Sequence, residues 1–333
     1  MKKLLSLFLA TVTALTLTVS ATACGGASDD NVVNVGILQV ATHSALDDAR
    51  LGFKEVVDAW AKENGKTVNY EERNANGDPN NEVSLANSLS AKNPDLLLGI
   101  ATSSARALAN TTMDIPVLFT AVTAPEEENL ISDNVTGTSD LNPVAEQIAL
   151  IADIVPNLKK IGFLYNSAEN NSRIQFEIAK QQAEKMKIEM VDFSTYQSSL
   201  IPSVVAGIPT DVQAVYVPTD NLMAENMQII CSILHEKGIP VIGGESGVCE
   251  DGEAVATLGI NYFELGKQTG AMAVAILSGE KTVKDVQADC ANTFKVKFAY
   301  YDKESSFFIN EGNAVAAGLS NEVIASLKAK YNV

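Results

Sequence analysis

The 333-residue sequence has little histidine, tryptophan or positive charge. It contains two histidines, one tryptophan and four cysteines, and its 24 lysines and arginines stand against 41 aspartates and glutamates, for a formal net charge of −17. A chain this acidic has no basic surface for a nucleic-acid backbone, and two histidines are too few for a histidine-rich metal carrier. The sequence therefore predicts neither a nucleic-acid partner nor a metal or other cofactor.

Long apolar runs are also scarce, and the one that stands out lies at the N-terminus. Leu4 to Val19 follows two lysines and is followed by small residues up to Ala23. This three-part pattern is typical of a secretory signal peptide, and the run is too short for a comfortable membrane span. We expect residues 1–23 to be removed, which would shift the formal net charge from −17 to −19, and the remainder to lie outside the cytoplasm.

Cys24 follows Ala21-Thr22-Ala23, a stretch that resembles a bacterial lipobox. The resemblance implies that Cys24 is lipidated and that residues 24–31 form a polar tether to the membrane. Bacterial lipoproteins more often have leucine where Ala21 stands. An ordinary cleaved signal with an incidental cysteine is the alternative.

The other cysteines, Cys231, Cys249 and Cys290, are odd in number. An oxidising compartment permits one disulfide, and both Cys249–Cys290 and Cys231–Cys249 are candidates that spacing does not separate. Three mostly buried thiols are the other possibility.

Apolar runs alternate with amphipathic stretches along the rest of the chain. The first series predicts strands at 32–40, 67–73, 95–100 and 116–122, with helices at 44–64, about 79–92 and about 103–111. The second series predicts helices at 143–155, 171–187, about 198–207 and 221–237, with strands at 160–166, 189–195, 214–220 and 240–245. A strand followed by a helix over 254–279 and a final helix over 321–332 complete the pattern.

Strands separated by helices imply parallel sheets with right-handed crossovers. We therefore predict an α/β fold with two doubly wound, Rossmann-like lobes joined by crossing segments. The first lobe is expected at 32–140 plus about 262–300, and the second at 141–261 plus about 301–333.

Small polar side chains recur at the carboxyl ends of the predicted strands, where open parallel sheets bind their ligands. The first series contributes Gln39, Thr42, Thr102, Ser103, Ser104, Thr120 and Thr123. The second contributes Asn166, Glu169, Asn171, Ser172, Thr219, Asp220, Asn221 and Glu245.

Two kinds of charge recognition follow from these residues. The Thr102-Ser103-Ser104 turn opens a helix, whose unpaired amides and partial positive charge suit a carboxylate, although plain N-capping would use the same residues. Asp220 and Glu245 are acids that could accept an ammonium group in a shielded cleft, but Asp220 could equally cap the next helix and Glu245 could be an exposed loop carboxylate. A zwitterion could then bridge the two lobes.

Several segments, in their order along the chain, resemble those of a known family. They are "VGILQVATHSALDDARLGF", "TSSARAL", "PVLFTAVTAP", "GFLYNSAENNS", "VPTDN", "PVIGGE" and "ATLGINYFELGKQTGAMA". Together they resemble the ABC-transporter substrate-binding lipoproteins of the tryptophan/tyrosine-type uptake group, over about residues 33 to 330. No single segment is specific, whereas their number and order are.

The resemblance implies a type I periplasmic-binding fold, with an amino acid held in a cleft between two lobes and delivered to an ABC permease and its ATPase by a monomeric, lipid-anchored receptor. It favours Thr102, Ser103, Ser104 and Thr123 for the ligand carboxylate, and Asp220 or Glu245 for the ammonium. An aromatic ligand would need an apolar slot, for which Val40, Phe119, Tyr262 and Phe263 are candidates.

Other functions fit the sequence less well. A hydrolase would need a base beside Ser103 or Ser167, but there is no G-x-S-x-G elbow, and His43 and His235 stand in other contexts. A sensory receptor that presents its ligand to a sensor would need the same cleft and is not separated from a transport protein. A purely structural lipoprotein is disfavoured by the polar strand ends.

Overall fold

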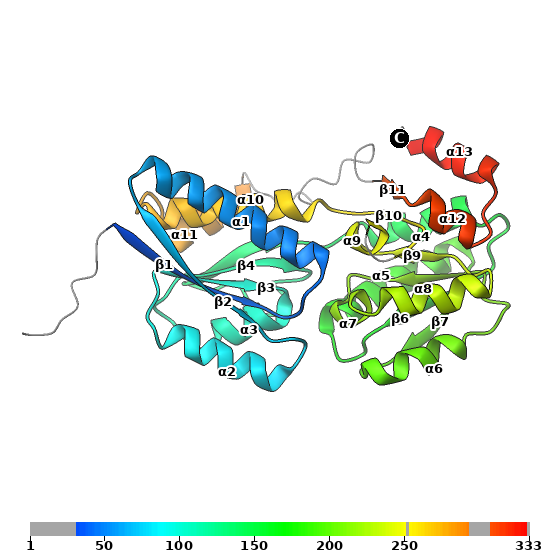
Figure 1. Ribbon diagram of the computed structural model, residues 1–333, viewed down its shortest axis with the longest axis horizontal. Coiled ribbons are helices and arrows are strands. Elements are labelled where there is room, and N and C mark those ends of the chain that lie inside the picture. Colours follow the sequence, from blue (N-terminus) through cyan, green and yellow to red (C-terminus); the bar gives the residue numbers. More distant parts are fainter. Residues whose placement is uncertain (1–30, 251–252, 293–306, 332–333) are drawn as a thin grey trace, which may run out of the picture. The chain divides into compact units, whose positions relative to one another are not determined.

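In the computed structural model, the described part of the chain is built around two mainly parallel sheets (Figure 1). The structure describes residues 31–250, 253–292 and 307–331, which belong to one compact unit. The α/β prediction with two doubly wound sheets is confirmed.

The first sheet has the strand order β2-β1-β3-β4-β5, with every pair parallel. Its strands are β1 (Val32–Gln39), β2 (Thr67–Asn74), β3 (Leu96–Ile100), β4 (Val117–Val122) and β5 (Val135–Ser139). All residues of β3 and β4 are buried, as expected for the central strands of a sheet covered on both faces.

The second sheet has the order β11-β10-β9-β8-β6-β7, in which β11 alone runs antiparallel to its neighbour. Its strands are β6 (Lys160–Tyr165), β7 (Glu189–Ser194), β8 (Ala214–Val217), β9 (Val241–Gly243), β10 (Ala256–Leu258) and β11 (Phe307–Ile309). We call the parts built on the first and second sheets the first and second lobes.

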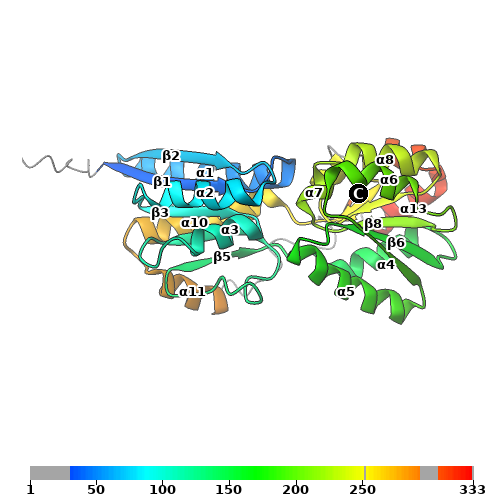
Figure 2. The same cartoon turned by 90° about the horizontal axis from the view of Figure 1, so that it is seen from below.

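Helices cover both faces of each sheet (Figure 2). Those of the first lobe are α1 (Ser44–Glu63), α2 (Pro79–Ser90), α3 (Thr102–Ala109), α10 (Tyr262–Leu277) and α11 (Val283–Asn292). Those of the second lobe are α4 (Val144–Ile154), α5 (Asn170–Met186), α6 (Ile201–Ala206), α7 (Asn221–Ala224), α8 (Met227–Glu236), α9 (Gly247–Glu250), α12 (Glu311–Ala316) and α13 (Asn321–Tyr331). No helix within the described ranges has the length and apolar run needed to cross a bilayer.

Helices α1 and α10 cover one face of the first sheet and touch each other through their backbones. A Cβ atom added at Gly52 would lie 2.0 Å from the carbonyl oxygen of Phe263, and one at Gly266 would lie 2.0 Å from that of Ala49. Neither contact leaves room for a side chain. The two glycines therefore set the spacing of the two helices.

The structure differs from the sequence prediction mainly in short elements. Strand β5 was not predicted, because five residues with Gly137 in the middle give little apolar signal; a Cβ there would lie 2.0 Å from the carbonyl oxygen of Phe119. The helix predicted over 221–237 is two helices, α7 and α8, separated at Glu225 and Asn226. The short elements α9, β11 and α12, and the helix α11, were also missed.

The cysteine alternatives are partly decided. Cys231 is a buried free thiol, so the Cys231–Cys249 disulfide is excluded. Burial raises the pKa of the Cys231 thiol, as expected for an unreactive core cysteine. The side chain of Cys290, and with it the Cys249–Cys290 alternative, lies outside the described residues. So do the predicted signal peptide, Cys24 and the tether up to residue 30.

Candidate functional site

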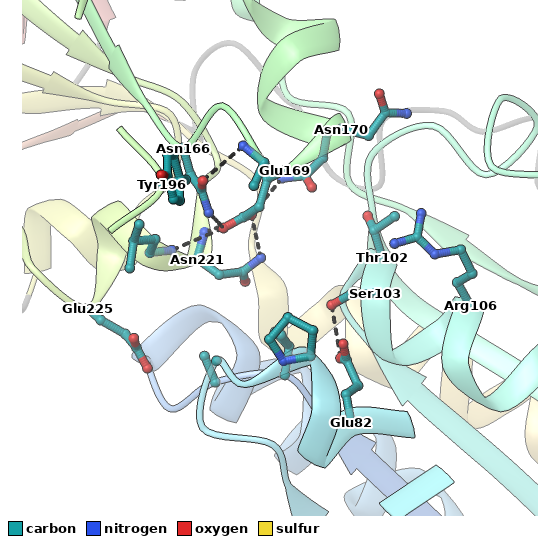
Figure 3. Close-up of a pocket in the computed structure, with 17 residues that line it drawn as sticks. Glu82, Thr102, Ser103, Arg106, Asn166, Glu169, Asn170, Tyr196, Asn221 and Glu225 are labelled. Atoms are coloured by element: carbon teal, nitrogen blue, oxygen red, sulfur yellow. Dashed lines mark hydrogen bonds between the residues drawn. The ribbon is translucent and has the colours of Figure 1, made fainter. Parts of the chain in front are cut away.

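Two adjoining cavities lie where loops that follow the strands of both sheets come together. The outer cavity has a volume of about 400 Å³ and is lined by residues of both lobes (Figure 3). The inner chamber has a free volume of only about 10 Å³, close to what one water-sized group needs. Thr102, Asn171 and Asn221 line both, so the two cavities lie on either side of the same side chains.

Helix α3 begins at this site with its first turn uncapped. Its N-cap residue is Ala101, which has no side chain to accept the first backbone N–H groups. Ala101 has φ 75° and ψ 163°, a region that residues other than glycine rarely adopt, and Ala121 at the end of β4 has φ 57°. The sharp turn at Ala101 takes the chain from β3 directly into α3, which leaves the N-terminal amides available to an anion.

The hydroxyls predicted to seat a carboxylate are already engaged. Ser103 Oγ and Ser104 Oγ donate to Glu82 Oε1 over 2.9 and 2.6 Å. Burial is the main cause that raises the pKa of Glu82, and the two serine hydroxyls oppose it. Ser103 and Ser104 therefore neither cap α3 nor offer their hydroxyl protons to a ligand, and only the backbone amides of this turn and the hydroxyl of Thr102 remain for that purpose.

Arg106 lies one turn further along α3 and is the only arginine among the described residues that line the outer cavity. Its Nη1 lies 3.0 Å from Glu128 Oε2, and the other oxygen of Glu128 accepts from Asn170 Nδ2, at the start of α5. The three side chains form a polar connection between α3 of the first lobe and α5 of the second.

Asp220 is a saturated acid. Its carboxylate is 2% exposed and accepts from the backbone N–H of Asn166 (2.6 Å), the hydroxyl of Ser172 (2.7 Å) and the backbone N–H of Met223 (2.9 Å). Burial, and then the neighbouring Glu169, raise the pKa of Asp220 to about 8. Asp220 caps α7 and joins the loop after β6 to the loop after β8. Its hydrogen bonds thus match the second of its two predicted roles, that of a helix cap.

Glu169 is saturated in the same way. It accepts from the side chains of Asn166, Asn171 and Asn221 and from the backbone N–H groups of Asn221 and Leu222 (Figure 3). Its carboxylate orders the asparagine-rich loop "YNSAENNS" around the outer cavity. Glu169 therefore organises the wall of the outer cavity, and its carboxylate is already occupied by protein donors.

A third buried acid, Asp140, follows β5 and lines the inner chamber. Its two oxygens accept from Thr123 Oγ1 (3.0 Å) and from the hydroxyl of Tyr262 (2.8 Å). Burial is the main cause that raises the pKa of Asp140. The hydroxyls of Thr123 and Tyr262 are thus both hydrogen-bonded to this carboxylate.

Glu245 differs from the other acids of the site. It is 1% exposed, and neither of its carboxylate oxygens has a hydrogen-bond partner among the residues that the structure describes. His43 Nδ1 lies 3.7 Å from its Oε1 and is itself buried without a hydrogen bond. Burial is the main cause that raises the pKa of Glu245; His43 and the nearby hydroxyl of Tyr262 lower it, and Asp140 raises it further.

The remaining predicted residues divide into lining and supporting ones. The outer cavity alone is lined by Asn166, Glu169 and Ser103. The inner chamber alone is lined by Thr123, Thr219, Asp220 and Glu245. Both cavities are lined by Thr102, Asn171 and Asn221. Six others line neither and are bound to protein groups: Gln39 to Asp47, Thr42 to Asn74, Ser104 to Glu82, Thr120 to Thr138, Ser172 to Asp220 and Tyr262 to Asp140.

Some lining residues were not predicted. Of the four candidates for an apolar slot only Val40 lines the outer cavity, whose other apolar or aromatic walls are Pro79, Leu222 and Tyr196. Glu82, Arg106 and Glu225 were missed because each lies within or after a helix and not at the end of a strand. His43, in contrast, lies in the short loop between β1 and α1, and that position could have marked it as a site residue.

The geometry gives no support to the hydrolase alternative, since the Ser103 hydroxyl is bound to Glu82 and His43 faces Glu245. Within the described residues, no cluster of three or more histidine, cysteine or acidic side chains could hold a metal ion.

Comparisons with known proteins point to a single family. Residues 34–313 match the family of ABC transporter substrate binding proteins. A "Tyrosine-binding protein" from Clostridioides difficile is 34% identical over 300 residues, which cover 86% of each chain.

Solved structures agree with that match. An ABC domain from Streptococcus pneumonia in complex with L-Trp has 30% identity and a TM-score of 0.74, over 88% of this chain and 97% of that one. The ligand-free, open structure of a substrate binding protein with adhesive properties from Clostridium difficile has 34% identity and a TM-score of 0.61, over 87% and 96%. The fold is also that of more distant type I periplasmic-binding proteins, such as a solute binding protein from Bacillus halodurans with bound myo-inositol at 15% identity and a TM-score of 0.59.

Proposed function

Because the chain belongs to the ABC transporter substrate-binding protein family, we propose that it captures an aromatic amino acid in its two adjoining cavities and delivers it to an ABC permease. The observation that carries the choice of an amino acid is Glu245, a buried carboxylate without a hydrogen-bond donor in the described structure. A buried carboxylate in this state is costly unless a cation or donor meets it.

The ligand ammonium would bind Glu245 in the inner chamber. Of the three buried acids that line this chamber, Asp140 and Asp220 already accept hydrogen bonds at both oxygens, and Glu245 accepts none within the described residues. A free volume of about 10 Å³ suits an ammonium group and excludes a bulky one. Glu245, rather than Asp220, is therefore our choice for the ammonium.

The ligand carboxylate would lie at the N-terminus of α3. The first-turn amides have no side-chain cap, and Thr102 borders both cavities. If the ligand carboxylate binds these amides, the α-carbon next to it can direct its ammonium group into the inner chamber. The guanidinium of Arg106 lies on the same helix and offsets the nearby Glu82. Helix N-termini and arginine are common carboxylate partners.

The aromatic side chain would occupy the outer cavity. Its volume of about 400 Å³ is in the usual range for small-ligand sites, and Val40, Pro79, Leu222 and Tyr196 supply apolar or aromatic walls. Tyr196 is 63% exposed, so its ring is accessible to a ligand in this cavity. The printed ligands of the relatives, tyrosine and L-Trp, support an aromatic choice.

Ligand capture would proceed by hinge closure, because the ammonium and carboxylate sites belong to different lobes. The TM-score is higher against the ligand-bound relative than against the open, ligand-free one, although the latter has the higher sequence identity. This difference supports a closed arrangement for the chain described here. A ligand that contacts both lobes only in that arrangement shifts the population toward it.

The family role implies further partners. We propose that a permease with its ATPase receives the ligand, and that a lipid on Cys24 anchors the protein to the outer face of the cell membrane. We also propose that the protein is a monomer and that it catalyses no reaction. The family match supports the first of these and the lipobox-like sequence supports the second.

A ligand series tests the proposal directly. Thermal unfolding and calorimetry are measured with L-tryptophan, L-tyrosine, L-phenylalanine and, as the non-aromatic control, L-isoleucine. Micromolar binding corresponds to about −8 kcal/mol, and at 1,000-fold excess over Kd it stabilises the folded state by about 4 kcal/mol. At least one aromatic amino acid is expected to give a clear upward shift of Tm.

Matched analogues separate the two charge contacts. Tryptamine lacks the carboxylate and N-acetyl-L-tryptophan lacks the ammonium, and each is expected to bind at least tenfold more weakly than L-tryptophan; tyramine and N-acetyl-L-tyrosine serve for tyrosine. No stabilisation by any aromatic amino acid at millimolar concentration would refute the proposed ligand class, and undiminished binding of an analogue would refute the corresponding contact.

A further inference from the structure

The hydrogen bonds around His43 fix the tautomer of its ring. Glu169 Oε2 accepts from Asn221 Nδ2 over 2.8 Å, so the amide of Asn221 must turn its Oδ1 the other way. That oxygen lies 3.3 Å from His43 Nε2. Because an amide oxygen only accepts, Nε2 must carry a hydrogen, and in a neutral ring Nδ1 then carries a lone pair.

This lone pair points toward a second acceptor. Nδ1 lies 3.7 Å from Glu245 Oε1, and both atoms are buried without a hydrogen bond to any described residue. Two acceptors that face each other leave both unsatisfied unless a hydrogen lies between them, and an unsatisfied buried acceptor is costly. One proton between them would satisfy both.

The other ionisable groups around the pair do not need that proton in the same way. Asp140 and Asp220 line the same chamber and accept donors at both oxygens. The hydroxyl of Tyr262 donates to Asp140, and its proximity also lowers the pKa of Glu245. Glu225, whose charge also interacts with His43, is exposed. The raised pKa of Glu245 agrees with a chamber that holds a proton when no ligand is present.

We propose that the ligand-free chamber holds one proton between His43 Nδ1 and Glu245, and that the ligand ammonium displaces it, so that capture releases one proton to solvent. The inference rests on the proposed function. The balance is simple: the protonated pair is neutral, the deprotonated pair carries one negative charge, and the ammonium replaces the charge of the proton that leaves. One ammonium nitrogen can reach both acceptors, because each contact needs only about 2.9 Å.

Calorimetry counts the released proton. L-tryptophan and L-tyrosine are titrated at pH 7 in phosphate and in Tris, whose ionisation enthalpies differ, and the difference in observed enthalpy gives the number of protons released. A value near one per ligand is expected, together with an affinity that falls up to tenfold for each pH unit of acidification, because the ligand-free state binds the extra proton. A value near zero overturns the proposal.

The two histidines make the source of the proton visible. With ¹⁵N-labelled histidine, the Nδ1 signal of His43 is expected to move toward that of an unprotonated nitrogen when ligand is added, while the Nε2 signal stays that of a protonated one. His235, in α8, is the internal reference. Proton release without any change at His43 would assign the proton elsewhere and overturn the proposal.

His43→Gln and His235→Gln form a matched pair of variants. A glutamine at 43 can donate to Glu245 without holding a titrating proton, so release is expected to fall below half a proton and the pH dependence to flatten, whereas His235→Gln keeps a value near one. Unchanged proton release in His43→Gln contradicts the proposal. If neither amino acid binds the unaltered protein, the proposed function fails instead; the NMR signal of ligand-free His43 then still tests the shared proton, and a bare Nδ1 overturns it.

Discussion

Asp220 and Glu245 are two buried acids at the ends of neighbouring strands, β8 and β9, and they differ in almost everything else. Asp220 accepts three hydrogen bonds from its own lobe, whereas Glu245 accepts none from the described residues and faces an imidazole of the other lobe. Both are at most 2% exposed. Burial and position at a strand end therefore do not distinguish a structural acid from a ligand-binding acid. The number of hydrogen bonds that the acid already accepts from the protein does distinguish them.

The largest expected effect is the loss of stability in Asp220→Ala. The substitution removes the acceptor of two backbone N–H groups and one hydroxyl, all buried, so the free energy of unfolding should fall by about 3 kcal/mol. Urea denaturation of the ligand-free protein measures it. Glu245→Ala is the matched variant and should lose only about 1 kcal/mol, because it removes the single contact with His43 and not three short hydrogen bonds. Equal losses would abolish the distinction between the two acids.

The next effect concerns binding. Glu245→Gln replaces a charged acceptor with a neutral amide, and the affinity for L-tryptophan or L-tyrosine should fall about 100-fold, or about 2.7 kcal/mol. Calorimetry measures it, with Glu236→Gln on the exposed side of α8 as the control that should stay within about twofold. A Glu245→Gln variant that binds as tightly as the unaltered protein would remove Glu245 from the site.

The same variant gives a pH test of stability. The folded-state pKa of Glu245 lies above its ordinary value of 4.5, so in the window between the two the folded chain binds more protons than the unfolded chain. The free energy of unfolding should therefore decrease as the pH rises from about 4.5 through the raised pKa, and less so in Glu245→Gln. Denaturation at several pH values without ligand measures the two slopes, and equal slopes would contradict the assignment.

The smallest expected effect lies across the chamber, at the turn that exposes the amides of α3. Ala101→Gly should raise the free energy of unfolding by about 1 kcal/mol, because glycine adopts φ 75° and ψ 163° without strain. Ala107→Gly, inside the same helix, should lower it by about 1 kcal/mol. Denaturation of both variants measures the contrast, and a loss in Ala101→Gly would show that the turn is not strained.

Most of the fold could be predicted because its strands and helices are long enough to show their periodicity. The limits of β1, α1, β2 and α5 differ from the predicted ones by at most one residue. The short elements β5, α9 and β11 were missed because they have neither a clear period nor more than a very short apolar run, whereas short buried strands such as β3 and β8 were predicted from their longer apolar runs. The single helix predicted over 221–237 was wrong because apolar residues stand on both sides of Glu225 and Asn226, which hides the break in the helix at these two residues.

The positions of the candidate site residues could be proposed from the sequence, but their hydrogen-bond partners could not. Thr102, Asn171, Asn221 and Glu245, chosen because they follow strands, line the outer cavity, the inner chamber or both. The partners of a hydroxyl depend on residues that lie far away in the sequence: Ser103 and Ser104 are bound to Glu82, more than twenty residues before them, and Ser172 to Asp220. Such pairings are set by tertiary packing, which the spacing of residues along one chain does not reveal.

The contact between α1 and α10 determines how the chamber can change shape. His43 directly precedes α1 and Tyr262 is the first residue of α10, and the glycine contacts leave no slack between these helices. The backbones that carry the imidazole and the phenol therefore move together. When the lobes separate, both groups leave Glu245 at the same time, so one movement of the first lobe exposes the buried carboxylate on that side.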